Sequence, residues 1–309
     1  MPALSVLDSQ MHYEDTGAAA GDAGPAWVFL HGNPASSHLW RKVLPRTRVL
    51  GRRLAPDLIG MGQSGKPDMA YSCDDHARYL AAWFDALDLQ DVVLVGIDWG
   101  ASLAFDWART HAHRVRGMAF METIVKPMSW ADFPAAARPR FEAFRTPGLG
   151  EQLVMEQNQF LAGSLTATVL TPLSAADRAV YEAPYATPAS RRPLLAWPRA
   201  MPLEGSPADV VERVQAYGAW LASSHDVPKL LLTFTGSPTL MIGPAMEAWC
   251  REHIASLTVQ ACGDAGHLAP EDQPGRIADA LVAWAGTALS SAATTASGSL
   301  PAGSHRPSA

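Results

Sequence analysis

The chain has 309 residues, of which 48% are hydrophobic and 17% charged, and its formal net charge is −6 at pH 7. This length is ample for one large α/β domain with an insertion, and the composition is that of an ordinary globular protein. The negative charge gives no reason to expect nucleic acid or a membrane as a partner. We also find no signal peptide and no apolar run long enough to span a membrane. We therefore expect a soluble, cytoplasmic protein and a monomer.

The three cysteines do not form a recognisable framework. Cys73, Cys250 and Cys262 are far apart in the sequence. Their spacing matches neither a metal-ligand cluster nor the disulfide pattern of a small secreted domain. We interpret them as reduced, buried thiols and expect no metal site.

Short apolar runs alternate with helical patterns in residues 1–124. Strands are expected at Met11–Asp15, Ala26–Leu30, Arg53–Pro56, Val92–Val95 and Val115–Met121. Helical patterns begin near Ser36–Leu44 and cover Asp74–Leu87 and Ala101–His111. Such alternation is typical of a parallel sheet with helices on both faces, so the expected fold class is α/β.

The pattern changes in residues 125–207, where prolines are frequent and no buried strand is expected. Helical pieces such as Glu151–Phe160 and Ala175–Tyr181 occur among recurring aromatic and methionine residues. We interpret this segment as a helical cap inserted between two strands of the sheet.

The sheet pattern resumes in residues 208–289, which complete the core domain begun by residues 1–124. Strands are expected at Lys229–Phe234 and Leu257–Ala261, and helices at Ala208–Leu221, Pro244–His253 and Pro274–Leu289. Residues 290–309 consist mainly of Ala, Ser, Thr, Gly and Pro and are expected to form a disordered tail.

A strand-to-helix turn at Gly96-Ile97-Asp98-Trp99-Gly100 is the most informative motif. The frame is that of a nucleophile elbow, which usually presents a serine above the sheet. Asp98 is ionised at pH 7 and can act as a nucleophile without a base, for example at a carbon that bears a halide or belongs to an epoxide. The product would be an ester on Asp98. A simple helix cap is the alternative role, but the flanking glycines and the preceding strand favour the nucleophile.

Hydrolysis of such an ester requires a base and an oxyanion hole. His267 lies in a glycine-rich loop after the last strand and comes last in the chain, as the histidine of an elbow-type triad should. The backbone N–H of Trp99 is one expected oxyanion donor, and the loop that contains Asn33 supplies the other. His31 in that loop is expected to brace it.

The histidine needs an acid to orient it. The residues that follow Lys229–Phe234, a common place for this acid, include no carboxylate. Glu122 ends the strand after the elbow helix, at the sheet edge where sites of this topology gather. Asp264, close to His267 in the sequence, is the competing candidate.

A departing halide would need N–H donors. The indole of Trp99 can only donate and is adjacent to the nucleophile, and the side-chain amide of Asn33 can supply a second donor. Otherwise Trp99 is a packed aromatic residue and Asn33 a turn residue before Pro34.

These residues together resemble the haloalkane dehalogenases of the α/β-hydrolase superfamily. The similar motifs are HGNPASSHLWR (31–41), APDLIGMGQSGKPD (55–68), GIDWGASLAFDWA (96–108), FMETI (120–124) and GHLAPED (266–272). The resemblance extends from about residue 11 to residue 289. Asn33 in HGNP is its most specific element, because related epoxide hydrolases usually carry an aromatic or apolar residue there.

The resemblance implies that the chain belongs to the subfamily whose catalytic acid follows the sixth strand of the sheet. It also implies a role for each site residue. Asp98 would be the nucleophile, His267 the base, Glu122 the acid, and Asn33 with Trp99 the halide-stabilising pair. Phe133, Phe144 and Phe160 would line the pocket, with Thr168 near the tunnel mouth. The residues after His267 depart from the family's aromatic-then-Gln pattern, so the wall near the base is expected to differ.

The expected enzyme hydrolyses a small haloalkane to a primary alcohol, halide and a proton, with water as the second substrate and without a metal or organic cofactor. The alternatives are an epoxide hydrolase with Tyr181 and Tyr185 as acids, a cofactor-free oxygenase of luciferase type, and a non-catalytic small-ligand receptor on a hydrolase fold.

Overall fold

The computed structural model describes residues 2–18 and 24–289. The tail expected at residues 290–309 lies outside the described residues. Within the described part of the chain, no helix is both long and apolar enough to cross a membrane.

An eight-stranded sheet in the order β1-β2-β4-β3-β5-β6-β7-β8 forms the centre of the molecule. Its strands are β1 (Ala3–Val6), β2 (Ser9–Asp15), β3 (Ala26–Leu30), β4 (Arg53–Pro56), β5 (Val92–Ile97), β6 (Val115–Met121), β7 (Lys229–Thr235) and β8 (Leu257–Asp264). The β1–β2 and β2–β4 pairs are antiparallel, and the pairs from β4–β3 to β7–β8 are parallel. The predicted α/β class is therefore confirmed.

Helices cover both faces of this sheet. The core helices are α1 (Cys73–Ala86), α2 (Asp98–Thr110), α7 (Ala208–Ser223), α8 (Pro244–His253), α9 (Ala269–Asp272) and α10 (Pro274–Trp284). Shorter helical segments are η1 (Ser37–Trp40), η2 (Leu44–Leu50), η3 (Ala112–Arg114) and η7 (Ala285–Leu289). Helices α1, α2 and α7 share one hydrophobic cluster with the sheet, and α10 with η1 and η2 shares the other. Two apolar layers therefore enclose the strands, as their fully buried sequences require.

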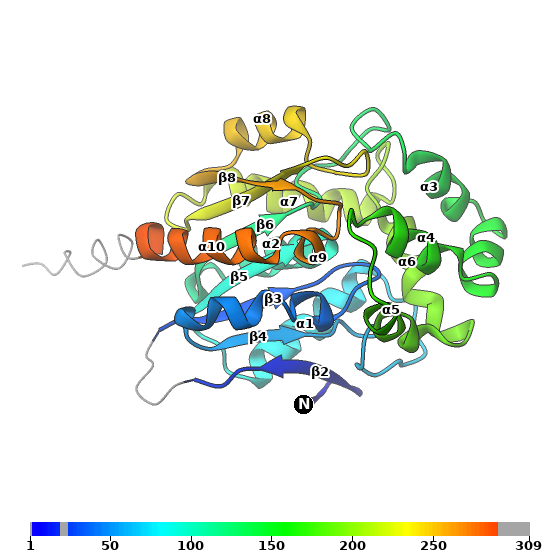
Figure 1. Cartoon of the computed structure of the whole chain (residues 1–309), viewed down its shortest axis with the longest axis horizontal. Coiled ribbons are helices and arrows are strands. Elements are labelled where there is room, and N and C mark those ends of the chain that lie inside the picture. Colours follow the sequence, from blue (N-terminus) through cyan, green and yellow to red (C-terminus); the bar gives the residue numbers. More distant parts are fainter. Residues whose placement is uncertain (1, 19–23, 290–309) are drawn as a thin grey trace, which may run out of the picture.

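The structure describes all of residues 125–207, and they form helices but no strand. They form α3 (Arg138–Arg145), η4 (Glu151–Glu156), α4 (Gln159–Ala167), α5 (Ala175–Glu182), η5 (Ala183–Tyr185), η6 (Ala189–Arg191) and α6 (Arg192–Ala200). Figure 1 shows α3, α4, α5 and α6 grouped beyond one end of the sheet, with α10 crossing in front of the strands. These helices form a cover over that end.

Several element boundaries match the sequence-based prediction, namely those of β3, β4, β6 and α8. Three predictions need correction. β1 was missed because it is only four residues long, too short for its alternating burial to stand out in the sequence. The helix expected to start at Ser36–Leu44 is two 3₁₀ segments. The helix expected at Glu151–Phe160 is broken at Asn158, whose φ is 54°.

Candidate active site

The elbow places Asp98 at the point where β5 meets α2. Its φ of 52° lies in the left-handed region, which a non-glycine residue adopts only when its surroundings hold it there. Its N–H donates to the Glu122 carbonyl at 3.0 Å, and its own carbonyl accepts from Thr123 Oγ1 at 2.7 Å. A Cβ at Gly96 would lie 2.5 Å from Ala101 Cα. The flanking glycine is therefore required for the turn.

The Asp98 carboxylate is held at both oxygens. Oδ1 accepts the backbone N–H of Asn33 at 2.8 Å, and Oδ2 lies 3.4 Å from His267 Nε2. The N–H of Trp99 follows at the first turn of α2, where amides have no helical partner. Sequence reasoning missed the role of Gly32, where a Cβ would lie 2.1 Å from Asp98 Oδ1. Glycine is therefore the residue that leaves room for this carboxylate.

His267 and Glu122 form a buried pair. His267 Nδ1 lies 3.1 Å from Glu122 Oε2, and Glu122 is fully buried. The glutamate also accepts backbone N–H groups, from Met241 at 2.8 Å and Ile242 at 3.2 Å. The sequence could not reveal these donors, because backbone amides carry no residue-type signal.

The ionisation of His267 reflects this setting. Burial by itself lowers its pKa, but the hydrogen bonds and charges of Asp98 and Glu122 outweigh burial and raise the pKa to about 10. The competing acid, Asp264, is exposed and accepts instead from Thr235 Oγ1 at 2.6 Å. Glu122 is the acid that the structure brings to His267.

His31 links two loops beneath the site. Its Nδ1 contacts the Gly32 carbonyl at 2.9 Å, and its Nε2 accepts the Leu58 N–H at 3.0 Å. These partners require a proton on Nδ1 and none on Nε2, and burial lowers the pKa of His31. The residue is therefore a neutral brace, as expected from the sequence.

A cavity of about 320 Å³ lies above these residues. Asn33, Asp98, Trp99 and His267 line it together with the four predicted pocket residues Phe133, Phe144, Phe160 and Thr168. Further lining residues, which sequence reasoning missed, include Arg140, Phe141, Pro198, Met201 and Met241. Phe141 lies one helical turn before Phe144 on α3, and that spacing could have identified it. The lining of the cavity is mainly apolar, and Asp98, Asn33 and His267 are among its polar residues.

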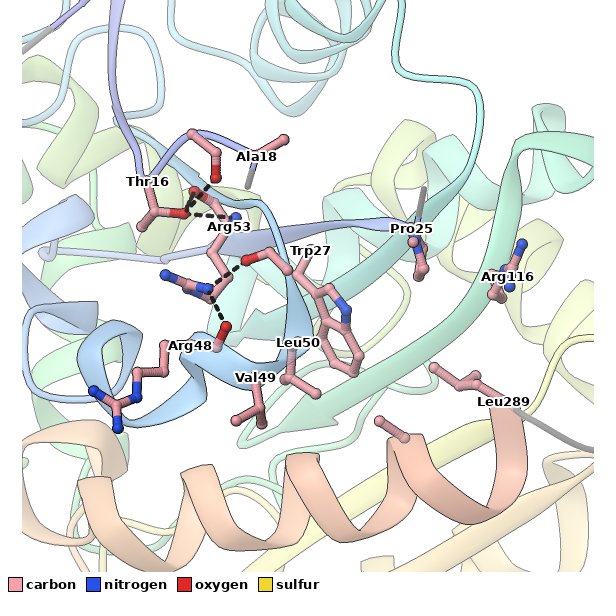
Figure 2. Close-up of a pocket in the computed structure, with 14 residues that line it drawn as sticks. Thr16, Ala18, Pro25, Trp27, Arg48, Val49, Leu50, Arg53, Arg116 and Leu289 are labelled. Carbon is pink, nitrogen blue, oxygen red and sulfur yellow. Dashed lines mark hydrogen bonds between the residues drawn. The ribbon is translucent and has the colours of Figure 1, made fainter. Parts of the chain in front are cut away.

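A second cavity, of about 920 Å³, lies near the N-terminal ends of the strands (Figure 2). Arg53 donates there to the carbonyls of Arg48, at 3.0 Å, and Gly51. Among its described lining residues there is neither a carboxylate nor a histidine. Ligands of such sheets bind at the carboxyl ends of the strands, so this cavity is not a candidate active site.

Comparisons with known proteins agree with this geometry. Residues 25–274 match the family model of the alpha/beta hydrolase fold. A haloalkane dehalogenase of Mesorhizobium japonicum is 45% identical over 283 residues, covering 91% of this chain and 89% of the relative. A haloalkane dehalogenase of Sphingobium indicum is 42% identical over 287 residues, covering 91% of this chain and 93% of the relative. The chain belongs to the haloalkane dehalogenase family. Its members are hydrolases that act on carbon–halide bonds, and the resemblance inferred from the motifs is confirmed.

Solved structures of dehalogenases match the whole fold. The crystal structure of a putative ancestral haloalkane dehalogenase has a TM-score of 0.88 and 41% identity, covering 95% of this chain and all of that one. The crystal structure of haloalkane dehalogenase DbeA of Bradyrhizobium elkani has a TM-score of 0.87 and 41% identity, covering 95% of this chain and 98% of that one. At this coverage the similarity includes both the sheet and the helices of residues 125–207.

The two tyrosines expected as acids in the epoxide hydrolase alternative do not lie at the cavity. Tyr181 donates its hydroxyl to Glu271 at 2.6 Å, and Tyr185 is buried in the same cluster of the cap. Neither tyrosine is among the described residues that line the 320 Å³ cavity. They are therefore not placed to protonate an epoxide oxygen at Asp98.

Proposed function

We propose that this dehalogenase converts a haloalkane and water to a primary alcohol, halide and a proton through an ester on Asp98. The observation that carries the proposal is the pair of contacts on the Asp98 carboxylate, Asn33 N–H on Oδ1 and His267 Nε2 near Oδ2, at the base of an apolar cavity. One oxygen is held in place and the other can attack.

In the first step, Asp98 Oδ2 forms a bond to the halogen-bearing carbon. The carbon–halogen bond breaks and its electron pair leaves with the halide. The Trp99 indole and the Asn33 side-chain amide, which both line the cavity, donate to the departing ion. These donors lower the barrier because they meet charge that develops during the reaction.

In the second step, His267 Nε2 accepts a proton from water, and the resulting hydroxide attacks Cγ of the Asp98 ester. The oxyanion at Oδ1 is stabilised by the N–H of Asn33, with that of Trp99 as the second donor. The intermediate then collapses: the bond from Cγ to the alkoxy oxygen breaks, the proton of the added hydroxyl passes to the departing alkoxide to give the alcohol, and the Asp98 carboxylate retains one oxygen from water. His267 passes the proton to solvent, and the halide dissociates.

Formation of the ester changes the charge next to His267. The negative charge of Asp98 is one of the interactions that raise the pKa of His267. Alkylation removes this charge, while Glu122 remains at Nδ1. The pKa of His267 therefore falls between the two steps, and the imidazole can accept the proton from water.

We also propose the division of the chain. Residues 1–124 and 208–289 would form the core domain, and residues 125–207 the cap that encloses the substrate. We further propose that the protein acts as a monomer and in the cytoplasm. Light scattering after size-exclusion chromatography and cell fractionation would test these two points.

Halide release from short terminal bromo- and iodoalkanes tests the function. We expect catalytic release by the native chain and none by Asp98→Asn. Asp264→Asn is the matched control, because Asp264 is exposed and bonded to Thr235, and it should retain turnover. Absence of release from every chain length would contradict the proposal, and epoxides would then be tested with the same variants.

A further inference from the structure

Helix α6 of the cap contains a proline where a helix normally needs an N–H. Pro198 lies inside α6 and cannot donate to the carbonyl of Leu194, one turn earlier. The pyrrolidine ring also crowds that carbonyl and pushes it away from the helix axis. Leu194 is fully buried, so its free carbonyl needs a partner other than water.

The partner is one of the two proposed halide donors. Asn33 Nδ2 donates to the Leu194 carbonyl at 3.5 Å, a long hydrogen bond between the core and the cap. A carbonyl can only accept, so this contact decides which end of the Asn33 amide faces α6. The amide nitrogen has two hydrogens, and the second is left for the cavity that Asn33 lines.

The same turn of α6 supports the other proposed donor. The ring of Trp197 stacks on that of Trp99, with centroids 4.5 Å apart and an interplanar angle of 26°. Trp197 is fully buried and stacks in turn on His76 at 4.2 Å. Residues 194–198 therefore contact both side chains that would hold the halide.

We propose that Pro198 is a positioning residue of the halide site. By withholding an N–H from Leu194, it leaves that carbonyl free to orient the Asn33 amide toward the departing ion. This inference rests on the proposed function of Asn33 as a halide donor. It assigns to the cap a direct part in halide binding.

The test is a double-mutant cycle of Pro198→Ala and Asn33→Ala, with bromide as the probe. Alanine at this position supplies the missing N–H, so the Leu194 carbonyl can return to the helix and Asn33 loses its partner. We expect P198A to raise the Kd of bromide about fivefold, the worth of one orienting hydrogen bond. In the N33A background, the same substitution should change the Kd by less than about twofold. The Kd is measured by bromide inhibition of turnover and by quenching of tryptophan fluorescence.

Two further readouts separate positioning from damage to the fold. P198A should keep or raise the Tm, because alanine favours a helix interior where proline does not. In single-turnover experiments it should slow cleavage of the carbon–bromine bond, which the donors assist, and leave hydrolysis of the ester unchanged. Pro193→Ala is the matched control on the same helix. Pro193 lies in the first turn, where an N–H has no helical partner, so this variant should leave the bromide Kd unchanged.

The cycle distinguishes failure of this inference from failure of the proposed function. Equal loss of bromide affinity from P198A with and without N33A would show that the proline ring acts by itself, and would overturn the inference. Unchanged affinity in P198A, with weakened affinity in N33A, would also overturn it while the role of Asn33 stood. Unchanged affinity in N33A would remove the role of Asn33 and the inference with it.

Discussion

Two carboxylates, at opposite edges of its ring, determine the ionisation of His267. Glu122 lies at Nδ1 and Asp98 at Nε2, and both side chains are buried. Burial opposes a charged imidazole, but the two partners outweigh it and raise the pKa of His267 above its ordinary value. In the proposed first step, alkylation of Asp98 removes one of these two negative charges from beside the ring.

This raised pKa predicts the sign of a stability change with pH. A group whose pKa is higher in the folded state stabilises the fold below its unfolded pKa of about 6.5, and this contribution is lost as pH rises through the folded pKa. The Tm difference between the native chain and His267→Phe should therefore shrink between about pH 6 and pH 10. Thermal unfolding across this range measures it, with the exposed His253→Phe as control. A difference that stays constant or grows would contradict the assignment.

The close contact at Gly32 predicts that a substitution there removes turnover without unfolding the protein. A Cβ at this position would lie 2.1 Å from Asp98 Oδ1, so Gly32→Ala must displace the carboxylate from its donor. We expect turnover to fall at least about 100-fold, since a misplacement of about 1 Å can cost that much. Gly243→Ala, where a Cβ meets nothing within 4 Å, is the control for both turnover and Tm. Normal turnover by Gly32→Ala would show that the carboxylate is not confined as described.

For single residues, the sequence was informative where the chemistry requires a particular side chain. Asp98, Glu122 and His267 could be chosen because they are titratable and follow strands. Gly32 could not be interpreted, because its importance depends on an atom of a residue far away in the chain. The backbone donors to Glu122, from residues 241 and 242, have no side-chain signature at all.

Among the elements, α9 connects the cap to the loop of the base. The Glu271 side chain is buried and accepts from Arg41 at 2.5 and 2.9 Å, Lys42 at 2.9 Å and Tyr181 at 2.6 Å. Its neighbour Asp272 accepts the N–H of Gly266, just before His267, and two N–H groups of cap residues 170 and 171, all at 2.9 Å. One short helix thus contacts η1, residues 170, 171 and 181, and the loop that holds His267.

Glu271→Gln should destabilise the chain strongly. It would remove the buried carboxylate that pairs with Arg41 and Lys42. Because both cations are partly exposed and Arg41 keeps its ion pair with Asp177, we expect a loss of about 1–3 kcal/mol. Urea denaturation measures the change. Glu247→Gln is the matched control, because its pair with Arg251 on α8 is largely exposed and worth less than about 1 kcal/mol. A loss for Glu271→Gln no larger than the control would show that the cluster does not stabilise the fold.

The helices of the cap were harder to predict than those of the core. α3 and α6 were both missed, and each has a proline in its first turn. Proline fits that position but resembles a helix breaker when only the sequence is known. The interior Pro198 made α6 harder still to predict, because the contact that compensates for it comes from Asn33, far away in the sequence.

Over the whole molecule, the proposed site collects residues from four strand ends. Asn33 follows β3, Asp98 follows β5, Glu122 follows β6 and His267 follows β8. The parallel sheet brings these carboxyl ends to one edge, where the cap closes over them (Figure 1). The topology could be predicted because apolar strands and helical periods alternate clearly. The cavity shape could not, because it depends on how the cap aromatics pack.

The apolar cavity predicts how specificity depends on substrate length. Each methylene buried contributes about 0.8 kcal/mol, which corresponds to roughly a fourfold rise in kcat/KM per carbon. The cavity holds about 320 Å³, so this rise should end once the chain fills it. Values of kcat/KM for 1-bromopropane through 1-bromodecane measure the profile. Values that do not vary across the series would show that the cavity does not enclose the substrate.

The covalent ester on Asp98 is the central claim, and trapping it is the most direct test. His267→Phe removes the base, so a bromoalkane should alkylate Asp98 and stop there. Intact-mass spectrometry should show one added alkyl group in place of a proton, and peptide mapping should place it on Asp98, with one equivalent of bromide released. Multiple turnovers without added mass, or an alkyl group on another residue, would contradict the two-step mechanism.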